Sequence, residues 1–199
     1  GGDIGTLKAA HWVSAYTLPQ GDALLAGFYV NELLLKLLPR QDAQPQVFDH
    51  YASCVALLAH QGKTAAPRAA ALQRQTAWVL RAFELLLLRQ LGLLPALTHS
   101  ASGHALHTGD TTLLQLQGDR GLCLASTPAE NAIALPAARW LGIEQGLQAD
   151  TPFAALLPML LTWPAAERTA LRNNLRHLLH QHIGTPLKTR QLMVALQGL

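Results

Sequence analysis

The run "VLRAFELLLLRQLGLL" (residues 79–94) constrains the fold of this 199-residue chain more than any other stretch. Apolar side chains occupy nearly every side of a helix drawn through it, so such a helix must be enclosed by other elements. Arg81, Glu84 and Arg89 interrupt the run, which favours a buried core helix over a membrane span. The sequence therefore predicts a helical bundle built around this segment.

Composition supports a mainly α-helical fold. Half of the residues are apolar, and most of these are Leu and Ala, a bias that favours helices over sheets. Prolines and glycines mark the expected helix ends. The predicted helices cover residues 22–38, 45–60, 67–91, about 130–143, 151–162, 164–183 and 188–197. We expect Asp22 to cap the first helix, and Pro164 to open the helix 164–183 with Thr162 near its cap.

Residues 96–128 differ in kind from the helical segments. Leu114, Leu116, Leu122 and Leu124 alternate with polar or small residues around the turn sequence "GDRG". This alternation predicts a small β-hairpin inserted between helices.

The stretch "ALTHSASGHALH" (residues 96–107) places His99, His104 and His107 within nine positions, which raises the question of a metal site. The two cysteines of the chain lie 69 residues apart and form neither a disulfide framework nor a paired-cysteine motif. A reducing, cytosolic setting is therefore expected. From the residues alone, a metal site and an ordinary polar loop both stay open.

Positive charge is concentrated at the C-terminal end of the chain. Residues 164–199 carry five basic side chains and one acidic side chain. Residues 1–163 carry ten basic and eleven acidic side chains. On the predicted helix 164–183, Arg168, Arg172 and Arg176 recur every four residues, which destabilises a helix by about 0.2–0.5 kcal/mol per like-charged pair. The row favours an anionic partner such as nucleic acid, with a solvated helix face as the competing interpretation.

The sequence offers little support for an enzyme. It contains no Walker loop, no G-x-G-x-x-G and no H-E-x-x-H motif, and its twelve acidic residues form no cluster suited to acid–base catalysis. Ser53 and Cys54 lie within an apolar helix face, where core packing explains them better than a nucleophilic role. A metal-dependent hydrolase is therefore the least supported hypothesis.

Four motifs follow one another along the chain. They are "GFYVNELLLKLLP" (27–39), "VFDHYASCVALLA" (47–59), "LRAFELLLLRQLGLLP" (80–95) and "GTPLKTRQL" (184–192). In this order they resemble the helical part of the bacterial recombination mediator RecO, over about residues 5–192. The resemblance implies that residues 1–18 are the last strand and linker of an otherwise absent OB-fold barrel. Residues 19–199 would form the helical domain, with the hairpin inserted at about 96–128.

The resemblance implies a DNA repair and recombination mediator, not an enzyme. RecO proteins bind single- and double-stranded DNA, anneal complementary strands, and work with RecR to load RecA onto strands coated by the single-strand-binding protein SSB. The implied location is the bacterial cytoplasm, in association with the nucleoid and without a membrane span. The alternative is a helical protein-interaction module that docks SSB or RecR and has little DNA affinity of its own.

The resemblance also extends the candidate DNA site. Lys188 and Arg190 match the basic pair of the family's "LK-x-R" motif. Together with Arg168, Arg172 and Arg176 they would form one basic surface that contacts phosphates without sequence preference.

A second candidate site concerns the tail of SSB, which is acidic and ends in Phe. Such a tail needs an apolar pocket rimmed by a basic fork. Arg81 offers the fork, with Arg74 seven residues earlier on the same helix face and Leu85 nearby. The competing interpretation is a partly buried ion pair between Arg81 and Glu84, one turn apart.

Many RecO proteins hold a zinc ion in the hairpin through C-x-x-C-G followed by a second C-x-x-C. The equivalent positions here are His99, Ser102, Cys123 and Ser126. Only His99 and Cys123 are suitable zinc ligands, because serine is a neutral alcohol at pH 7. We therefore expect a degenerate zinc-finger-like hairpin without a metal or other cofactor. The alternative recruits the other histidines of the stretch into a Cys-His₃ set.

Overall fold

The computed structural model describes residues 8–9, 11, 18–61, 69–131, 133–189 and 191, and gives only the backbone for residues 61, 69–74, 128 and 131. The predicted fold class is confirmed, because this part of the chain is mainly helical with a small antiparallel sheet. The predicted barrel strand and linker, residues 1–18, lies almost wholly outside the described residues. No helix among the described residues is long and apolar enough to cross a membrane.

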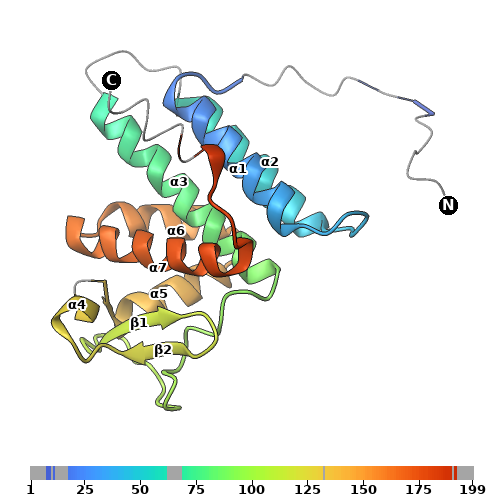
Figure 1. Ribbon diagram of the computed structural model, residues 1–199. Coiled ribbons are helices and arrows are strands. Elements are labelled where there is room, and N and C mark those ends of the chain that lie inside the picture. The colour runs from blue at the N-terminus through green and yellow to red at the C-terminus, as the bar shows by residue number, and fades with distance from the viewer. Residues whose placement is uncertain are drawn as a thin grey trace.

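The elements form three layers (Figure 1). In chain order they are α1 (Asp22–Leu37), α2 (Pro45–Gln61), α3 (Ala69–Gln90), β1 (Leu113–Gln117), β2 (Gly121–Leu124), α4 (Pro128–Asn131), β3 (Leu135–Pro136), α5 (Ala137–Leu147), α6 (Pro152–Leu161) and α7 (Ala165–Ile183). Helices α1, α2 and α3 make one layer, α6 and α7 cross below them, and α5 and the sheet lie on the far side of α6 and α7.

The first layer matches its predicted boundaries closely. Both α1 and α2 begin where expected and end within one residue of the prediction, and α3 ends one residue early. The predicted start of α3 falls outside the described residues. Asp22 is the first helical residue and not the N-cap, so that prediction was wrong. Gly21 takes the cap position with φ of 55°, a backbone conformation that glycine adopts without steric strain.

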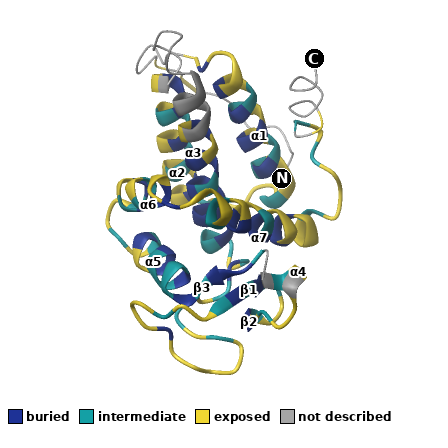
Figure 2. Cartoon of the chain, turned by 90° about the vertical axis from the view of Figure 1, so that its left-hand side faces the viewer, coloured by how far each residue is buried: buried dark blue, intermediate teal, exposed yellow. Residues whose placement is uncertain are grey.

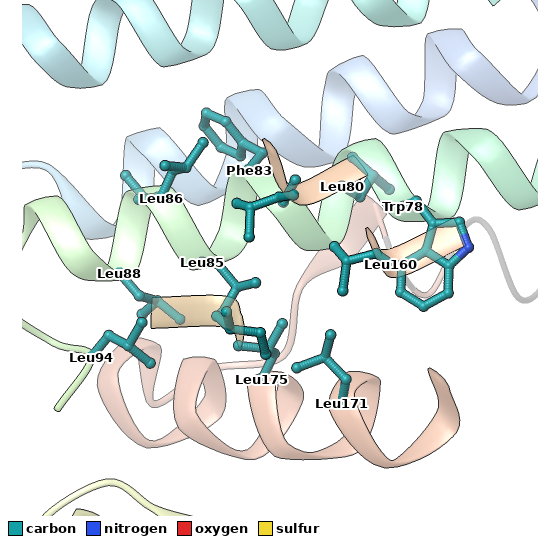
Figure 3. Close-up of a cluster of buried hydrophobic side chains, with 14 of the residues drawn as sticks. Trp78, Leu80, Phe83, Leu85, Leu86, Leu88, Leu94, Leu160, Leu171 and Leu175 are labelled. Carbon is teal, nitrogen blue, oxygen red and sulfur yellow. The ribbon is translucent and has the colours of Figure 1, made fainter. Parts of the chain in front are cut away.

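Helix α3 is the central helix of the bundle. Every residue from 82 to 88 is buried, and α3 packs against α1, α2, α6 and α7. In Figure 3, Leu85 of α3 points toward Leu171 and Leu175 of α7. Full burial of one such leucine contributes about 1.5–3 kcal/mol. The all-round apolar run of the sequence is therefore explained by neighbours on every side.

Helices α6 and α7 also lie within two residues of their predicted bounds. The predicted capping of α7 was wrong in detail. Pro164 occupies the N-cap position, and the Thr162 hydroxyl donates to the Met159 carbonyl oxygen at 2.7 Å, so Thr162 closes α6. Between α5 and α6, a Cβ on Gly146 would lie 2.6 Å from Leu156 Cδ2, and only glycine permits that approach.

The predicted hairpin is confirmed as strands β1 and β2, joined by the turn that "GDRG" indicated. The sheet order is β2-β1-β3, all antiparallel. Leu114, Leu116 and Leu122 are buried as the alternation predicts. Leu124 is instead 64% exposed, because it lies at the end of an edge strand beyond the covering helices.

The predicted helix over residues 130–143 was wrong. That segment contains the end of α4, then β3, and only from Ala137 a helix. Short α4 is held by a capping box: the Thr127 hydroxyl accepts the Glu130 N–H at 3.2 Å, and the Glu130 carboxylate accepts the N–H groups of Ser126 and Thr127. Pro136 has no N–H to donate, which suits it to the N-cap position of α5 and not to a helix interior.

Asn174 of α7 joins the helices to the sheet. Its side-chain oxygen accepts the Leu116 N–H at 2.8 Å, and its side-chain nitrogen donates to the carbonyl oxygens of Ile133 and Ala170 at 2.6 and 2.8 Å. Extending the β1–β3 register would pair Leu116 with Ile133. The buried Asn174 amide therefore bridges two backbone groups that a longer β3 would have paired directly.

A buried carboxylate holds the start of the hairpin segment. Glu144 of α5 accepts a hydrogen bond from the Leu97 N–H at 3.0 Å and forms an ion pair with Arg89 at the end of α3. Gln148 donates to the other carboxylate oxygen at 2.9 Å. The path from α3 into the hairpin is thereby fixed against α5.

Candidate nucleic-acid interface

Arg168, Arg172 and Arg176 form a row along the outer side of α7, which we call the α7 basic face. Arg172 and Arg176 are exposed, and the exposed residues of α7 appear yellow in Figure 2. Arg168 is half-buried, with its guanidinium carbon 6.0 Å from the ring centroid of Trp78. Residues four apart on a helix differ by about 40° in direction, so the row winds slowly around α7. It presents three cations to one side of the molecule.

The acid nearest to this row in sequence is already neutralised. Glu167, the single acidic residue of the C-terminal segment, forms an ion pair with Arg139 of α5 at 2.8 Å. The Arg139 guanidinium also lies 5.2 Å from the ring centroid of Trp163. Glu167 is thus directed toward α5, and the α7 basic face keeps its charge.

The chain beyond α7 turns back toward α1. Gly184 ends α7 with φ of 67°, and its N–H bonds to the His180 carbonyl oxygen at 3.0 Å. The Lys36 ammonium of α1 then donates to the Thr185 hydroxyl at 2.9 Å. Figure 1 shows this segment, in red, running beside α1. Lys188 is exposed on it, and Arg190 lies outside the described residues.

Glu32 of α1 binds the start of the helical turn at Lys188 and Thr189. One carboxylate oxygen accepts the Lys188 N–H at 2.8 Å, and the other accepts the N–H and the hydroxyl of Thr189 at 2.9 and 2.6 Å. Partial burial acts to raise the pKa of the Glu32 carboxyl. The hydrogen bonds from Thr189 and Lys188 and the charge of Lys36 outweigh that effect and hold this pKa below its ordinary value. The charged carboxylate is therefore the form that binds the segment.

Sequence reasoning missed the roles of Glu32 and Lys36. Both residues are at least partly exposed on a helix whose other side is apolar, which is the ordinary position for solvated charges. The only available signal was the interruption of the apolar surface at Glu32. The partners of Glu32 lie more than 150 residues away in the sequence, and helix periodicity gives no information on contacts between such distant residues.

The predicted site for an SSB tail is only partly compatible with the structure. Leu85 is fully buried in the core, so its side chain cannot line a surface pocket, and that assignment was wrong. Arg81 forms the competing ion pair with Glu84 at 2.6 Å, and its side chain is 15% exposed. Arg74 lies in α3, but its side chain is outside the described part.

Glu84 belongs to the bundle interior. The Tyr29 hydroxyl of α1 donates to its carboxylate at 2.6 Å, beside the pair with Arg81. Burial, together with the negative charge of Glu84, raises the pKa of Tyr29 well above its ordinary value. Tyr29 therefore remains a hydrogen-bond donor, and this cluster joins α1 to α3.

The four positions that align with zinc ligands occur in a compact hairpin segment. His99 is exposed and pairs with Ala105 in an isolated antiparallel bridge. Cys123 is buried in β2, opposite Gln115. Ser126 donates its N–H to Glu130 in the capping box of α4. Among the described residues, no three His, Cys, Asp or Glu side chains are placed to share a metal ion.

The Ser102 hydroxyl is occupied by hydrogen bonds. It lies 2.9 Å from the Ser100 hydroxyl and 2.9 Å from His104 Nδ1. Leu97, Leu106 and Leu122 are buried beneath this polar network. The residues present therefore do not fit a four-ligand zinc site, and hydrogen bonds with apolar packing hold the segment instead.

The buried thiol of Cys54 in α2 is unsuited to act as a nucleophile. Cys54 is fully buried, and burial raises the pKa of its thiol to about 12. A nucleophilic cysteine requires the thiolate, so core packing accounts for Cys54.

Comparison with known proteins identifies the family. A family profile described as "Recombination protein O C terminal" matches residues 18–191. The chain belongs to the RecO family. It is 46% identical to the DNA repair protein RecO of Variovorax paradoxus, covering all of this chain and 75% of that protein. It is 44% identical to the DNA repair protein RecO of Delftia acidovorans, covering 99% of this chain and 72% of that protein. These similarities assign the chain a role in DNA repair and recombination.

Proposed function

We propose that this RecO-family chain acts in DNA repair by holding the phosphate backbone of DNA on the α7 basic face. The observation that supports this proposal is the row of arginines on the outer side of α7, with the neighbouring Glu167 paired to Arg139. Lys188, which is exposed on the segment beside α1, is proposed as a further phosphate contact. Arg190, two residues after Lys188, is proposed as a further phosphate contact from the sequence alone.

The proposed contact is with phosphates and not with bases. Trp78 and Trp163, the aromatic residues beside the arginines, are 4% and 2% exposed, so neither offers a ring to stack on a base. Arginine and lysine contacts to phosphate carry no sequence information and weaken with salt. Both single- and double-stranded DNA are therefore proposed ligands.

The partners proposed from the family resemblance are RecR and SSB, with RecA loading as the outcome. Arg81 is the described residue proposed for contact with the acidic SSB tail, since its guanidinium keeps some exposure beside Glu84. The proposed role is binding, without bond-making chemistry, in the bacterial cytoplasm at the nucleoid.

The second candidate function is a protein-docking module with little DNA affinity. Exposed apolar side chains on α1 and α2 favour it: Phe28, Leu35 and Phe48 are 49%, 85% and 66% exposed. Exposed large apolar side chains of this kind can contribute to an interaction surface when they lie together. The two candidates differ in whether the α7 basic face contributes to DNA affinity.

A pair of matched double variants separates the two candidates. Arg172→Gln/Arg176→Gln removes two charges from the α7 basic face, and Lys8→Gln/Arg40→Gln removes two exposed charges elsewhere. With a fluorescent thymidine oligonucleotide, we expect the first variant to bind about fivefold or more weakly than the second. Equal affinities for the two variants would assign the chain to the docking module.

A further inference from the structure

Glu32 is an acid that the structure places against the proposed DNA-binding segment. It lies on α1, yet it accepts hydrogen bonds from Lys188 and Thr189, which follow α7. Both carboxylate oxygens are used. A free negative charge beside a basic surface would repel DNA, so the position of this acid calls for an explanation.

Capping of a helical turn provides the explanation. Helical structure begins at Lys188, and the first N–H groups of a helical turn have no partner within it. A carboxylate is a strong acceptor for such groups, a task usually performed by a residue just before the turn. Here the acceptor comes from another helix, so the same contacts that cap the turn also attach it to α1.

The hydrogen bond to Glu32 fixes the position of the Lys188 backbone, from which its side chain extends. Its backbone N–H is bound to Glu32, while its side chain is exposed. One turn further along α1, the Lys36 ammonium holds Thr185, so the crossing from α7 to α1 is fastened at two points. The backbone of Lys188 is thus held on α1 while its side chain remains exposed.

We propose that Glu32 is a positioning residue for DNA binding: it holds the backbone of Lys188, a residue of the proposed DNA-binding surface, so that the exposed Lys188 ammonium can contact a phosphate. This inference rests on the proposed contact of that surface with DNA. An exposed lysine on an unattached segment would have to be ordered when DNA binds, and that ordering opposes binding. Because Glu32 holds the Lys188 backbone, that backbone is already ordered before DNA binds.

The substitution Glu32→Gln distinguishes positioning from simple electrostatics by the sign of its effect. Loss of a negative charge alone should strengthen binding to a polyanion. Loss of positioning should weaken binding about two- to fivefold and reduce the salt dependence by about one phosphate contact. Asp22→Asn is the matched control, because it removes the same charge from the same helix far from Lys188; we expect it to leave affinity unchanged or slightly raised.

A double-mutant cycle tests whether Glu32 acts through Lys188. We expect Lys188→Gln and Glu32→Gln to weaken binding of a fluorescent thymidine oligonucleotide by similar factors, and the double variant to bind no more weakly than either one. Thr189→Ala, which removes a single hydrogen bond, provides a milder variant if Glu32→Gln lowers the yield of folded protein. We expect it to weaken binding by a smaller factor.

Two outcomes are separable. Unchanged or tighter binding by Glu32→Gln, or additive losses in the double variant, would overturn the positioning role while leaving the α7 basic face intact. Unchanged binding by Arg172→Gln/Arg176→Gln would overturn the proposed function itself.

Discussion

At the residue scale, the side chain of Asn174 makes the hydrogen bonds that a longer strand β3 would make with β1. Its amide supplies an acceptor to Leu116 and a donor to Ile133 at the position where β3 is too short to do so. The Leu116 N–H is buried and the Ile133 carbonyl is partly buried, and an unpartnered donor or acceptor in such a place is destabilising. The stability of the contact between α7 and the sheet therefore depends strongly on this residue.

We predict that Asn174→Ala lowers the free energy of unfolding by about 2–4 kcal/mol, since it leaves the buried Leu116 N–H and the partly buried Ile133 carbonyl without their bonds. Chemical denaturation measures this change. Asn173→Ala, at the adjacent and less buried position, is the control and should change it by less than about 1 kcal/mol. Equal effects of the two substitutions would argue against the bridge.

The Glu32 carboxylate gives a residue-scale prediction about pH. Its folded-state pKa is held low, so the stability that it contributes is complete above the unfolded value of about 4.3 and is lost as pH falls through the folded value. The difference in unfolding free energy between the wild-type chain and Glu32→Gln should therefore shrink between pH 7 and about pH 3. A difference independent of pH would mean that the charged form of Glu32 is not the one that holds the segment.

At the element scale, the hairpin segment is held by hydrogen bonds and apolar packing. The hydroxyl of Ser102 contacts Ser100 and His104, and the Leu97, Leu106 and Leu122 side chains fill the interior below. The β1–β2 ladder continues this packing into the sheet. The segment has its own sources of stability at each position where a metal would otherwise act.

We predict that a chelator such as EDTA leaves the melting temperature of the chain unchanged. Ser102→Ala should instead lower the unfolding free energy by about 0.5–1.5 kcal/mol, because it removes two hydroxyl contacts. A clear drop in melting temperature with EDTA, together with one zinc ion per purified chain, would contradict this account of the hairpin.

The elements also show which parts of the fold the sequence could predict. Helix periodicity and breaker residues located α1, α2, α6 and α7 within two residues, because those signals act over a few positions. The segment 130–143 failed because β3 is only two residues long and is stabilised by pairing with β1, a contact that local propensity does not report. The pocket assignment of Leu85 failed because α7 packs on that face of α3. The apolar run predicts that the helix is enclosed, but it does not show which element covers which side chain.

At the scale of the whole molecule, the three layers separate a buried interior from a charged outer side. Helix α3 packs against α1 and α2 within its layer and against α6 and α7 below it, and α7 keeps one face exposed that carries its arginines. The segment after α7 returns to α1 and brings Lys188 into reach of Glu32. The candidate DNA surface therefore depends on residues far apart in the chain. The sequence could indicate Arg168, Arg172, Arg176, Lys188 and Arg190, but not the contact of Glu32 with the Lys188 backbone.

The salt dependence of DNA binding tests the central claim most directly. The wild-type chain and the triple variant Arg168→Gln/Arg172→Gln/Arg176→Gln would be titrated with a single-stranded oligonucleotide over a range of salt concentrations. Loss of three phosphate contacts should reduce the slope of log affinity against log salt by about two and weaken binding about tenfold or more. Identical slopes and affinities for the two proteins would contradict a DNA-binding role for the α7 basic face.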